Sequence, residues 1–361
     1  MAYNNIGNEL NNIANGIQPE SILLTNNINW PNYVYESVSG IFPAETTLIC
    51  HGGFLTPGHG TGNIYALLLN NSKPINLIEL LPKQNDCYYH NSTQIDMDGD
   101  GKIDLLFAQT CKHAITQKNE GHLLWAKQPS NPTTPHSWNT YHLVNGPDIL
   151  ITTQYINDTS LIIYASEFFN AQLVYYILNF GTNNPNITYD ALIDNSIGAV
   201  YQTQLVDIFK NNALVLLVND HVGGNGTNNG VWIYEFPPNF PSILGGEFKK
   251  TQIASGFNTT NSPGAGAPGF IYPFNIMTDS NKPYNIAIAG DGNYFAYELT
   301  LIDENTKTYS KNIIRTIPGT CGSLAIGDVN NDGYNELFMP FYEDGIVYVY
   351  TTNPNNITIA L

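Results

Sequence analysis

The sequence predicts an all-β fold, a single β-propeller of six four-stranded blades. The first observation is that a short apolar run recurs six times in the 361 residues, with starts 57, 57, 53, 72 and 51 residues apart. The second is that a Gly-rich or Asn-rich loop and an aromatic strand follow each run. Such repeats favour a propeller because one blade cannot cover both of its faces, whereas neighbouring blades cover one another.

Each repeat is expected to contain four strands. A β-branched strand comes first, the apolar run second, an aromatic strand third and a more polar strand fourth. No amphipathic helix pattern interrupts the repeats, although residues 1–17 are compatible with one short helix. The six apolar runs are TLIC (47–50), DLLF (104–107), LIIY (161–164), LVLL (214–217), IAIA (286–289) and LFMP (337–340).

The sixth repeat ends soon after its aromatic strand, so a terminal strand is expected to close the ring. Two segments can supply it, ESILLT at 20–25 or ITIAL at 357–361. We expect one domain over residues 1–361, with residues 1–19 as an N-terminal extension. Seven blades are the alternative, if residues 1–31 hold further strands.

Composition limits the classes of partner. Thirteen Lys and Arg residues against thirty Asp and Glu residues give a formal net charge of −17, which disfavours nucleic acid and anionic membranes. No apolar stretch approaches the roughly 20 residues of a membrane helix, so no membrane insertion is expected. The first residues also lack the basic and apolar regions of a classical signal peptide.

Two loops have the spacing of calcium ligands. The first carries Asp96, Asp98, Asp100 and Asp104, and the second carries Asp328, Asn330, Asp332 and Glu336. Oxygen ligands at positions 1, 3, 5 and 9 suit Ca²⁺, with the carbonyl of Lys102 or Tyr334 at position 7. We therefore expect two structural calcium ions, which favour an extracellular location; metal-free acidic turns are the alternative.

These loops, followed by DLLF and ELFM, resemble the FG-GAP or VCBS repeats of integrin α-subunit propellers. A narrower resemblance lies in the second repeat. Trp125-Ala-Lys-Gln-Pro129 and Trp138-Asn-Thr-Tyr-His142 are similar to a blade ending of fungal aldos-2-ulose dehydratase propellers. That resemblance implies lyase or dehydratase chemistry on a small carbohydrate-like substrate. Fungal lectins share the calcium repeat and imply the alternative, a lectin or adhesion module without catalysis; a protein-binding platform stays open as well.

Reactive side chains concentrate where the second strand of a repeat ends or the first begins. In a propeller these positions lie near the channel mouth, where a pocket is expected. The catalytic candidates are His51, His90, His221, Glu167 and Asp220, with Asp291 and Glu343 at equivalent positions. Imidazoles with a carboxylate can bind Zn²⁺ or another divalent metal, or an imidazole can act as a general base. The alternative is that they are ordinary solvated loop residues.

The four cysteines form no CxxC pair. Cys87 and Cys111 lie on adjacent connections of one blade and can form a disulfide. Cys50 and Cys321 lie in blades one and six and can form a second, and either pair can equally stay reduced. Several loop aromatics are expected to be exposed and able to stack on a sugar ring: Trp30, Tyr88, Tyr89, Phe168, Phe169 and Tyr342.

Overall fold

The computed structural model describes residues 2–3, 6–54, 60–113, 115–223, 229–259, 266–316, 319–343, 345–354 and 359–360. The chain divides into two compact units. The first unit comprises residues 1–2 and 22–196, and the second comprises residues 3–21 and 197–361. Residues 55–59, which include His59 of the Gly-rich segment HGGFLTPGHG (51–60), lie outside the described residues.

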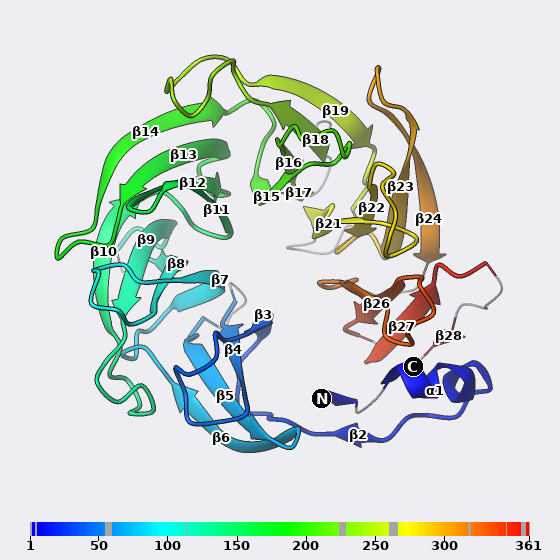
Figure 1. Ribbon diagram of the computed structural model, residues 1–361, viewed down its shortest axis with the longest axis horizontal. Coiled ribbons are helices and arrows are strands. Elements are labelled where there is room, and N and C mark those ends of the chain that lie inside the picture. The colour runs from blue at the N-terminus through cyan, green and yellow to red at the C-terminus, as the bar shows by residue number, and fades with distance from the viewer. Residues whose placement is uncertain are drawn as a thin grey trace. The chain divides into compact units, whose positions relative to one another are not determined.

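The first unit contains three four-stranded antiparallel sheets (Figure 1). The first sheet is β3 (Pro31–Glu36), β4 (Thr46–Gly52), β5 (Ile64–Asn70) and β6 (Lys73–Glu79). The second is β7 (Cys87–Ile95), β8 (Asp104–Lys112), β9 (Asn119–Lys127) and β10 (Asn139–Asn145). The third is β11 (Ile151–Asn157), β12 (Ser160–Glu167), β13 (Gln172–Asn179) and β14 (Asn186–Asp194).

The second unit contains three more sheets of the same kind. The fourth sheet is β15 (Val200–Val206), β16 (Val215–Asp220), β18 (Gly230–Glu235) and β19 (Lys249–Ser255). The fifth is β21 (Ile271–Phe274), β22 (Asn285–Ala289), β23 (Phe295–Asp303) and β24 (Thr308–Thr316). The sixth is β25 (Ala325–Gly327), β26 (Glu336–Phe341), β27 (Ile346–Thr351) and β28 (Ile359–Ala360).

The six successive four-stranded sheets are the blades of a six-bladed β-propeller, so the predicted fold class is confirmed. The fourth strand of the sixth blade comes from the C-terminus, where Ala360 pairs with Tyr348. The other candidate, the segment around β2 (Ser21–Ile22), instead pairs with β1 (Ala2–Tyr3) in a two-stranded sheet. A second small sheet joins β17 (Val222–Gly223) to β20 (Gly266–Ala267).

The expected N-terminal helix is α1 (Ile6–Ala14). Its apolar residues Leu10 and Ile13 are buried against Val349 of β27. The N-terminal extension is therefore packed on the sixth blade of the second unit. None of the described helices has the length and apolar character to cross a membrane.

Apolar faces of neighbouring blades pack together within each unit. Between the first and second blades, Ile49, Leu105 and Phe107 form a cluster around Trp138, which is 1% exposed. A second cluster joins the second and third blades, and a third joins the fourth and fifth. Burial of a Trp side chain contributes about 4 to 6 kcal/mol by area, so such clusters fix the strand ends and the loops that carry the polar residues.

Candidate functional site

The first predicted calcium loop brings three carboxylates together. Asp96, Asp98 and Asp104 each offer an oxygen, and these oxygens lie within 4.8 Å of one another. Asp98 Oδ1 is buried and has no hydrogen-bond partner. An unpaired buried carboxylate oxygen is costly, and this all-oxygen donor set fits a hard cation such as Ca²⁺. Within the described part of the chain it is the only such group of three His, Cys, Asp or Glu ligands.

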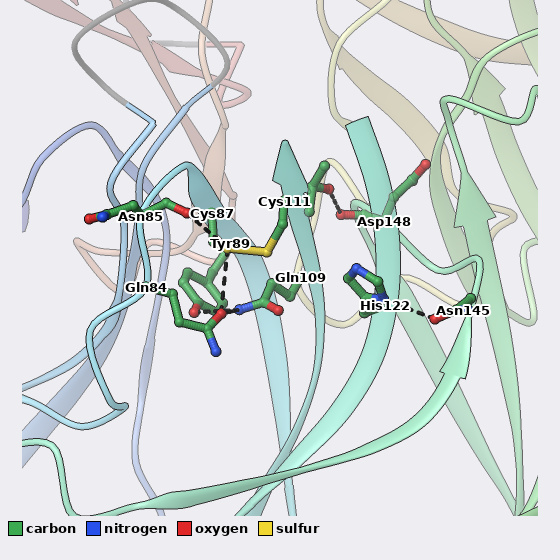
Figure 2. Close-up of a disulfide and its surroundings, with 10 residues drawn as sticks. Gln84, Asn85, Cys87, Tyr89, Gln109, Cys111, His122, Asn145 and Asp148 are labelled. Carbon is green, nitrogen blue, oxygen red and sulfur yellow. Dashed lines mark hydrogen bonds between the residues drawn. A yellow bond between two sulfur atoms is a disulfide. The ribbon is translucent and has the colours of Figure 1, made fainter. Parts of the chain in front are cut away.

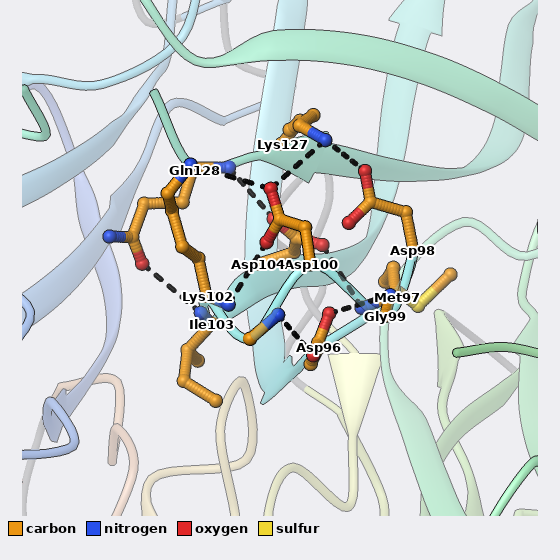
Figure 3. A network of polar contacts seen from close by, with 11 residues as sticks. Asp96, Met97, Asp98, Gly99, Asp100, Lys102, Ile103, Asp104, Lys127 and Gln128 are labelled. Carbon is orange, nitrogen blue, oxygen red and sulfur yellow. Dashed lines mark hydrogen bonds and ion pairs between the residues drawn. The ribbon is translucent and has the colours of Figure 1, made fainter. Parts of the chain in front are cut away.

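A lysine side chain reaches the same loop from β9 (Figure 3). The Lys127 ammonium donates to Asp98 Oδ2 and lies 3.1 Å from Asp100 Oδ2. Hydrogen bonds from Lys127 to these two carboxylates raise its pKa. Burial raises the pKa of Asp104 to about 6 even though the backbone N–H groups of Gln128 and Met97 donate to its carboxylate. The loop therefore holds excess negative charge that a cation stabilises.

The second predicted calcium loop shares its backbone hydrogen bonds with the first but differs in its side-chain partners. Asp328 accepts backbone N–H groups of Asp332 and Gly333, as Asp96 accepts those of Gly99 and Gly101. Side-chain amides of Asn330 and Asn353 donate to Asp332 Oδ2 at 3.2 and 2.8 Å. Amide groups thus occupy oxygens that a metal would use, so this loop supports a calcium site less strongly than the first.

His51, a predicted catalytic residue, is held in a buried hydrogen-bond chain. Its Nδ1 lies 3.2 Å from the Tyr33 carbonyl oxygen, which can only accept, so Nδ1 carries the proton. Its Nε2 therefore accepts from the Ser92 hydroxyl at 2.9 Å, and Ser92 in turn accepts from the Tyr35 hydroxyl at 2.8 Å. Burial lowers the pKa of His51 to about 4. With both ring nitrogens bonded, His51 is not placed to bind a metal.

His90 is close to His51 but has no comparable partners. It lies in β7, where a bulge separates Tyr89 from Ser92 in the pairing with β8. His90 Nδ1 is buried without a hydrogen-bond partner. Burial, together with the nearby His51, lowers the pKa of His90 to about 3. A neutral imidazole that is 5% exposed is shielded from a substrate.

Glu167, at the end of β12, lies beside a carboxyl group that the sequence analysis did not identify, Asp148. The Glu167 carboxylate accepts from Asn170, Gln172 and Tyr176. Asp148 accepts from the backbone N–H groups of Phe168 and Phe169 at 2.8 and 2.9 Å. Burial, with the Glu167 charge, raises the pKa of Asp148 to about 8. Both groups are at most 2% exposed, so they support the loop rather than face solvent.

Asp220, at the end of β16, is also sealed from solvent. Its Oδ1 accepts from the Gly230 N–H and the Trp232 indole N–H at 2.8 and 2.7 Å. Its Oδ2 is buried and unpartnered, and burial raises the pKa of Asp220 to about 7. This carboxyl group ties β16 to β18 within the fourth blade.

His221 follows Asp220 and forms a pair with Asp291 in the second unit. His221 Nδ1 donates to the Pro268 carbonyl at 3.0 Å, and Nε2 lies 3.7 Å from Asp291 Oδ2. The Asp291 side chain is 29% exposed. It follows β22, pairs with Cys321 in an isolated bridge at the start of a turn, and has a backbone φ of 52°. The Asp291 carboxyl group therefore lies beside a predicted catalytic histidine and also reaches solvent.

A second carboxylate acts on Asp291. Partial burial raises the pKa of Asp291, the His221 charge opposes this effect, and the Glu343 charge adds to it. Glu343 is exposed, and although burial acts to raise its pKa, hydrogen bonds from Thr320 hold the pKa below its usual value. Asp291 thus has a raised pKa and Glu343 a lowered one. Pairs of carboxyl groups whose pKa values are pushed apart in this way are typical of acid–base sites.

Two tyrosines lie near His221 and Asp291. Tyr201 stacks on the His221 ring with centroids 4.9 Å apart. Tyr342 is 53% exposed, and its ring lies against Gly322, where an added Cβ would come within 2.8 Å of it. An exposed tyrosine face beside carboxyl groups suits a sugar ring, which has both apolar and hydroxylated surfaces.

The structure also resolves the cysteines and loop aromatics. Cys87 and Cys111 form a disulfide between directly paired residues of β7 and β8 (Figure 2), whereas Cys50 and Cys321 are free and buried. The expectation that Tyr88 and Tyr89 are exposed is wrong, because both pack inside the first unit at 2% and 1% exposure.

Comparisons with known proteins identify no family. No protein-family model matches the chain, and no curated protein matches it. The resemblance of the loops to FG-GAP or VCBS repeats therefore stays a prediction.

Three solved structures resemble the chain at low identity. Rhamnogalacturonan lyase YesW is 12% identical with a TM-score of 0.39, covering 91% of this chain and 73% of that one. A glucose dehydrogenase is 11% identical with a TM-score of 0.40, covering 89% and 96%. A β-fructofuranosidase from Schwanniomyces occidentalis, complexed with fructosyl-erythritol, is 8% identical with a TM-score of 0.41, covering 93% and 82%. Likenesses at this level identify no activity for this chain.

Proposed function

We propose that the chain is a calcium-stabilised β-propeller that eliminates water from a small carbohydrate-like substrate, with Asp291 as the proton-transferring group. One observation carries the proposal. The partly exposed Asp291 carboxyl group lies 3.7 Å from His221 and within the field of Glu343. An acid of raised pKa is a stronger base when ionised, and a stronger base suits removal of a proton next to a carbonyl group.

Asp291 can perform both proton transfers of such an elimination. Its carboxylate takes the proton from the carbon next to the carbonyl; a C=C bond forms as the C–O bond of the neighbouring hydroxyl breaks. The same carboxyl group then gives its proton to the departing hydroxyl, which leaves as water. Asp291 ends as it began, and no oxidant or reductant is consumed.

The neighbouring residues prepare Asp291 for this role. His221 is a positioning residue, because the Pro268 carbonyl fixes its Nδ1 as a donor and so directs Nε2 at Asp291. Partial burial raises the Asp291 pKa and the Glu343 charge adds to this effect, while the Tyr342 face supports the sugar ring.

Calcium in the first loop, held by Asp96, Asp98 and Asp104, would cross-link the loop that precedes β8 and neutralise its carboxylates. The Cys87–Cys111 disulfide supports an oxidising, extracellular location.

The test uses the full chain and a panel of ketoses and aldonic acids. Dehydration is detected as loss of one water by mass spectrometry and as ultraviolet absorption of the unsaturated carbonyl product. Asp291→Asn should lower turnover by about 10² to 10⁴-fold, with melting temperature and calcium content unchanged. The control is Asp279→Asn, an exposed carboxylate of the same unit that should leave turnover unchanged.

No product from any sugar would overturn the proposal. Saturable sugar binding without product, retained in Asp291→Asn, would assign the chain to the lectin alternative.

A further inference from the structure

We infer that His122 and His142, with Asn145, form a binding site for a divalent transition-metal ion on the second blade. The inference is independent of the proposed dehydratase activity and of the calcium loops. It rests on where two imidazole nitrogens point and on the strand register that places them there.

Two imidazole nitrogens converge on a single atom. His122 Nδ1 lies 3.0 Å from Asn145 Oδ1, and His142 Nε2 lies 2.7 Å from the same oxygen. The ring centroids are 5.7 Å apart. Figure 2 shows the His122 ring directed at Asn145 from the neighbouring strand. A metal ion close to the present position of that oxygen would contact both nitrogens.

The register of β9 and β10 brings these residues to one face. His142 pairs with Leu124, and Asn145 pairs with His122. Because alternate residues of a strand share a face, the partners of 122 and 124 lie on the same side of the sheet. A register shift between His142 and Val144 places Asn145, rather than the apolar Val144, opposite His122. Bulges commonly redirect a side chain in this way.

The donor set selects the class of metal. Imidazole nitrogens favour Zn²⁺, Cu²⁺ and Ni²⁺, whereas Ca²⁺ favours oxygen alone. His142 and Asn145 are exposed, so an ion reaches them from solvent. Exposed Glu120 lies two residues before His122 on the same face of β9, and its charge attracts a cation.

Metal binding requires only a small rearrangement. Metal–nitrogen bonds are about 2.0 to 2.1 Å long, shorter than the present contacts to Asn145. The exposed amide therefore turns aside and becomes the third ligand. Each ring now donates an N–H hydrogen bond to the Asn145 amide oxygen. On metal binding that proton moves, through solvent, to the other nitrogen of the same ring.

The experiment titrates Zn²⁺ into the full chain by calorimetry, without a polyhistidine tag and with excess Ca²⁺ to occupy oxygen sites. One equivalent should bind. His122→Gln and His142→Gln should each weaken binding by about tenfold or more, or at least about 1.4 kcal/mol. His113→Gln is the control, because His113 Nδ1 instead accepts backbone N–H groups of Ile115 and Thr116.

Electron paramagnetic resonance with Cu²⁺ gives a second readout. The wild-type spectrum should show coupling to two imidazole nitrogens, and each variant should show one. Metal-free melting curves verify that the variants fold, which is expected at a solvent-accessible site. No saturable binding, or binding unchanged in both variants, overturns the inference. The Asp291→Asn variant should bind Zn²⁺ with wild-type affinity. A failure of the zinc-site inference can therefore be distinguished from a failure of the proposed dehydratase activity.

Discussion

Asp148 makes the stability of the first unit depend on pH. Its pKa is raised from 3.8 to about 8, chiefly by burial. The folded chain therefore retains a proton that the unfolded chain loses near pH 4. Stability is fully present at acid pH, falls as pH rises, and levels off above the folded-state pKa of about 8. At about 1.4 kcal/mol per pKa unit the whole effect is about 6 kcal/mol, of which about 4 falls between about pH 5 and pH 9.

Asp148→Asn removes the titration and keeps the shape. Its amide nitrogen cannot accept from Phe168 or Phe169, so the variant should be less stable at about pH 5, by about 1 to 3 kcal/mol. At about pH 9 it should match or exceed the wild type. Urea unfolding at both pH values measures the two differences. Asp158→Asn, in an exposed turn, is the control. An equal change in stability with pH in the wild type and Asp148→Asn would refute the reasoning.

Four further predictions concern the first calcium loop, the Asp291 site and the disulfide. Removing Ca²⁺ with a chelator should lower the melting temperature. If Ca²⁺ was present at 100 times its Kd, the free energy of unfolding should fall by about 2.7 kcal/mol. Lys127→Met should then tighten Ca²⁺ binding in calorimetry because no ammonium competes for Asp98; unchanged affinity would contradict this. Glu343→Gln should shift the acidic limb of the pH–rate profile to lower pH, since the Glu343 charge raises the Asp291 pKa; a shift upward would be the wrong sign. Cys87→Ser with Cys111→Ser, 24 residues apart, should cost about 3 kcal/mol in urea unfolding, and no loss would remove the disulfide from the stability of the blade.

The blade pattern was predictable because an apolar run such as DLLF at 104–107 is buried on both faces. Leu105, Leu106 and Phe107 are each 0% exposed, with Phe107 in the cluster toward the first blade and Leu106 in the cluster toward the third. Such continuous runs are visible in the sequence. The segment that supplies the last strand could not be predicted, because the short segments near both termini have similar composition. Pairing of Ala360 with Tyr348 decides it.

The strand ends were predictable from sequence, but the burial of their polar side chains was not inferred. His51 lies two residues after Ile49, and Glu167 lies two residues after Ala165. Because side chains alternate across a strand, both point to the face that the neighbouring blade covers, where Ile49 and Ala165 are core residues. The alternation of side chains along a strand therefore indicates that His51 and Glu167 are buried and have structural roles.

Asp291 escapes the rule because it stands beyond Ala289, the last paired residue of β22, in an isolated bridge to Cys321 where a turn begins. Its φ of 52° turns the backbone out of the extended conformation, so alternation with Ala289 no longer fixes the direction of its side chain. Gly266 and Gly269 leave room beside His221 and Asp291, where an added Cβ would lie 1.8 Å from His221 Nε2 and 2.9 Å from Asp291 Cβ. Reactive groups on such turns combine a fixed position with access to solvent, whereas those inside strands obtain only the fixed position. This difference directs the proposed chemistry to Asp291 and leaves His51, His90, Glu167 and Asp220 to hold the blades.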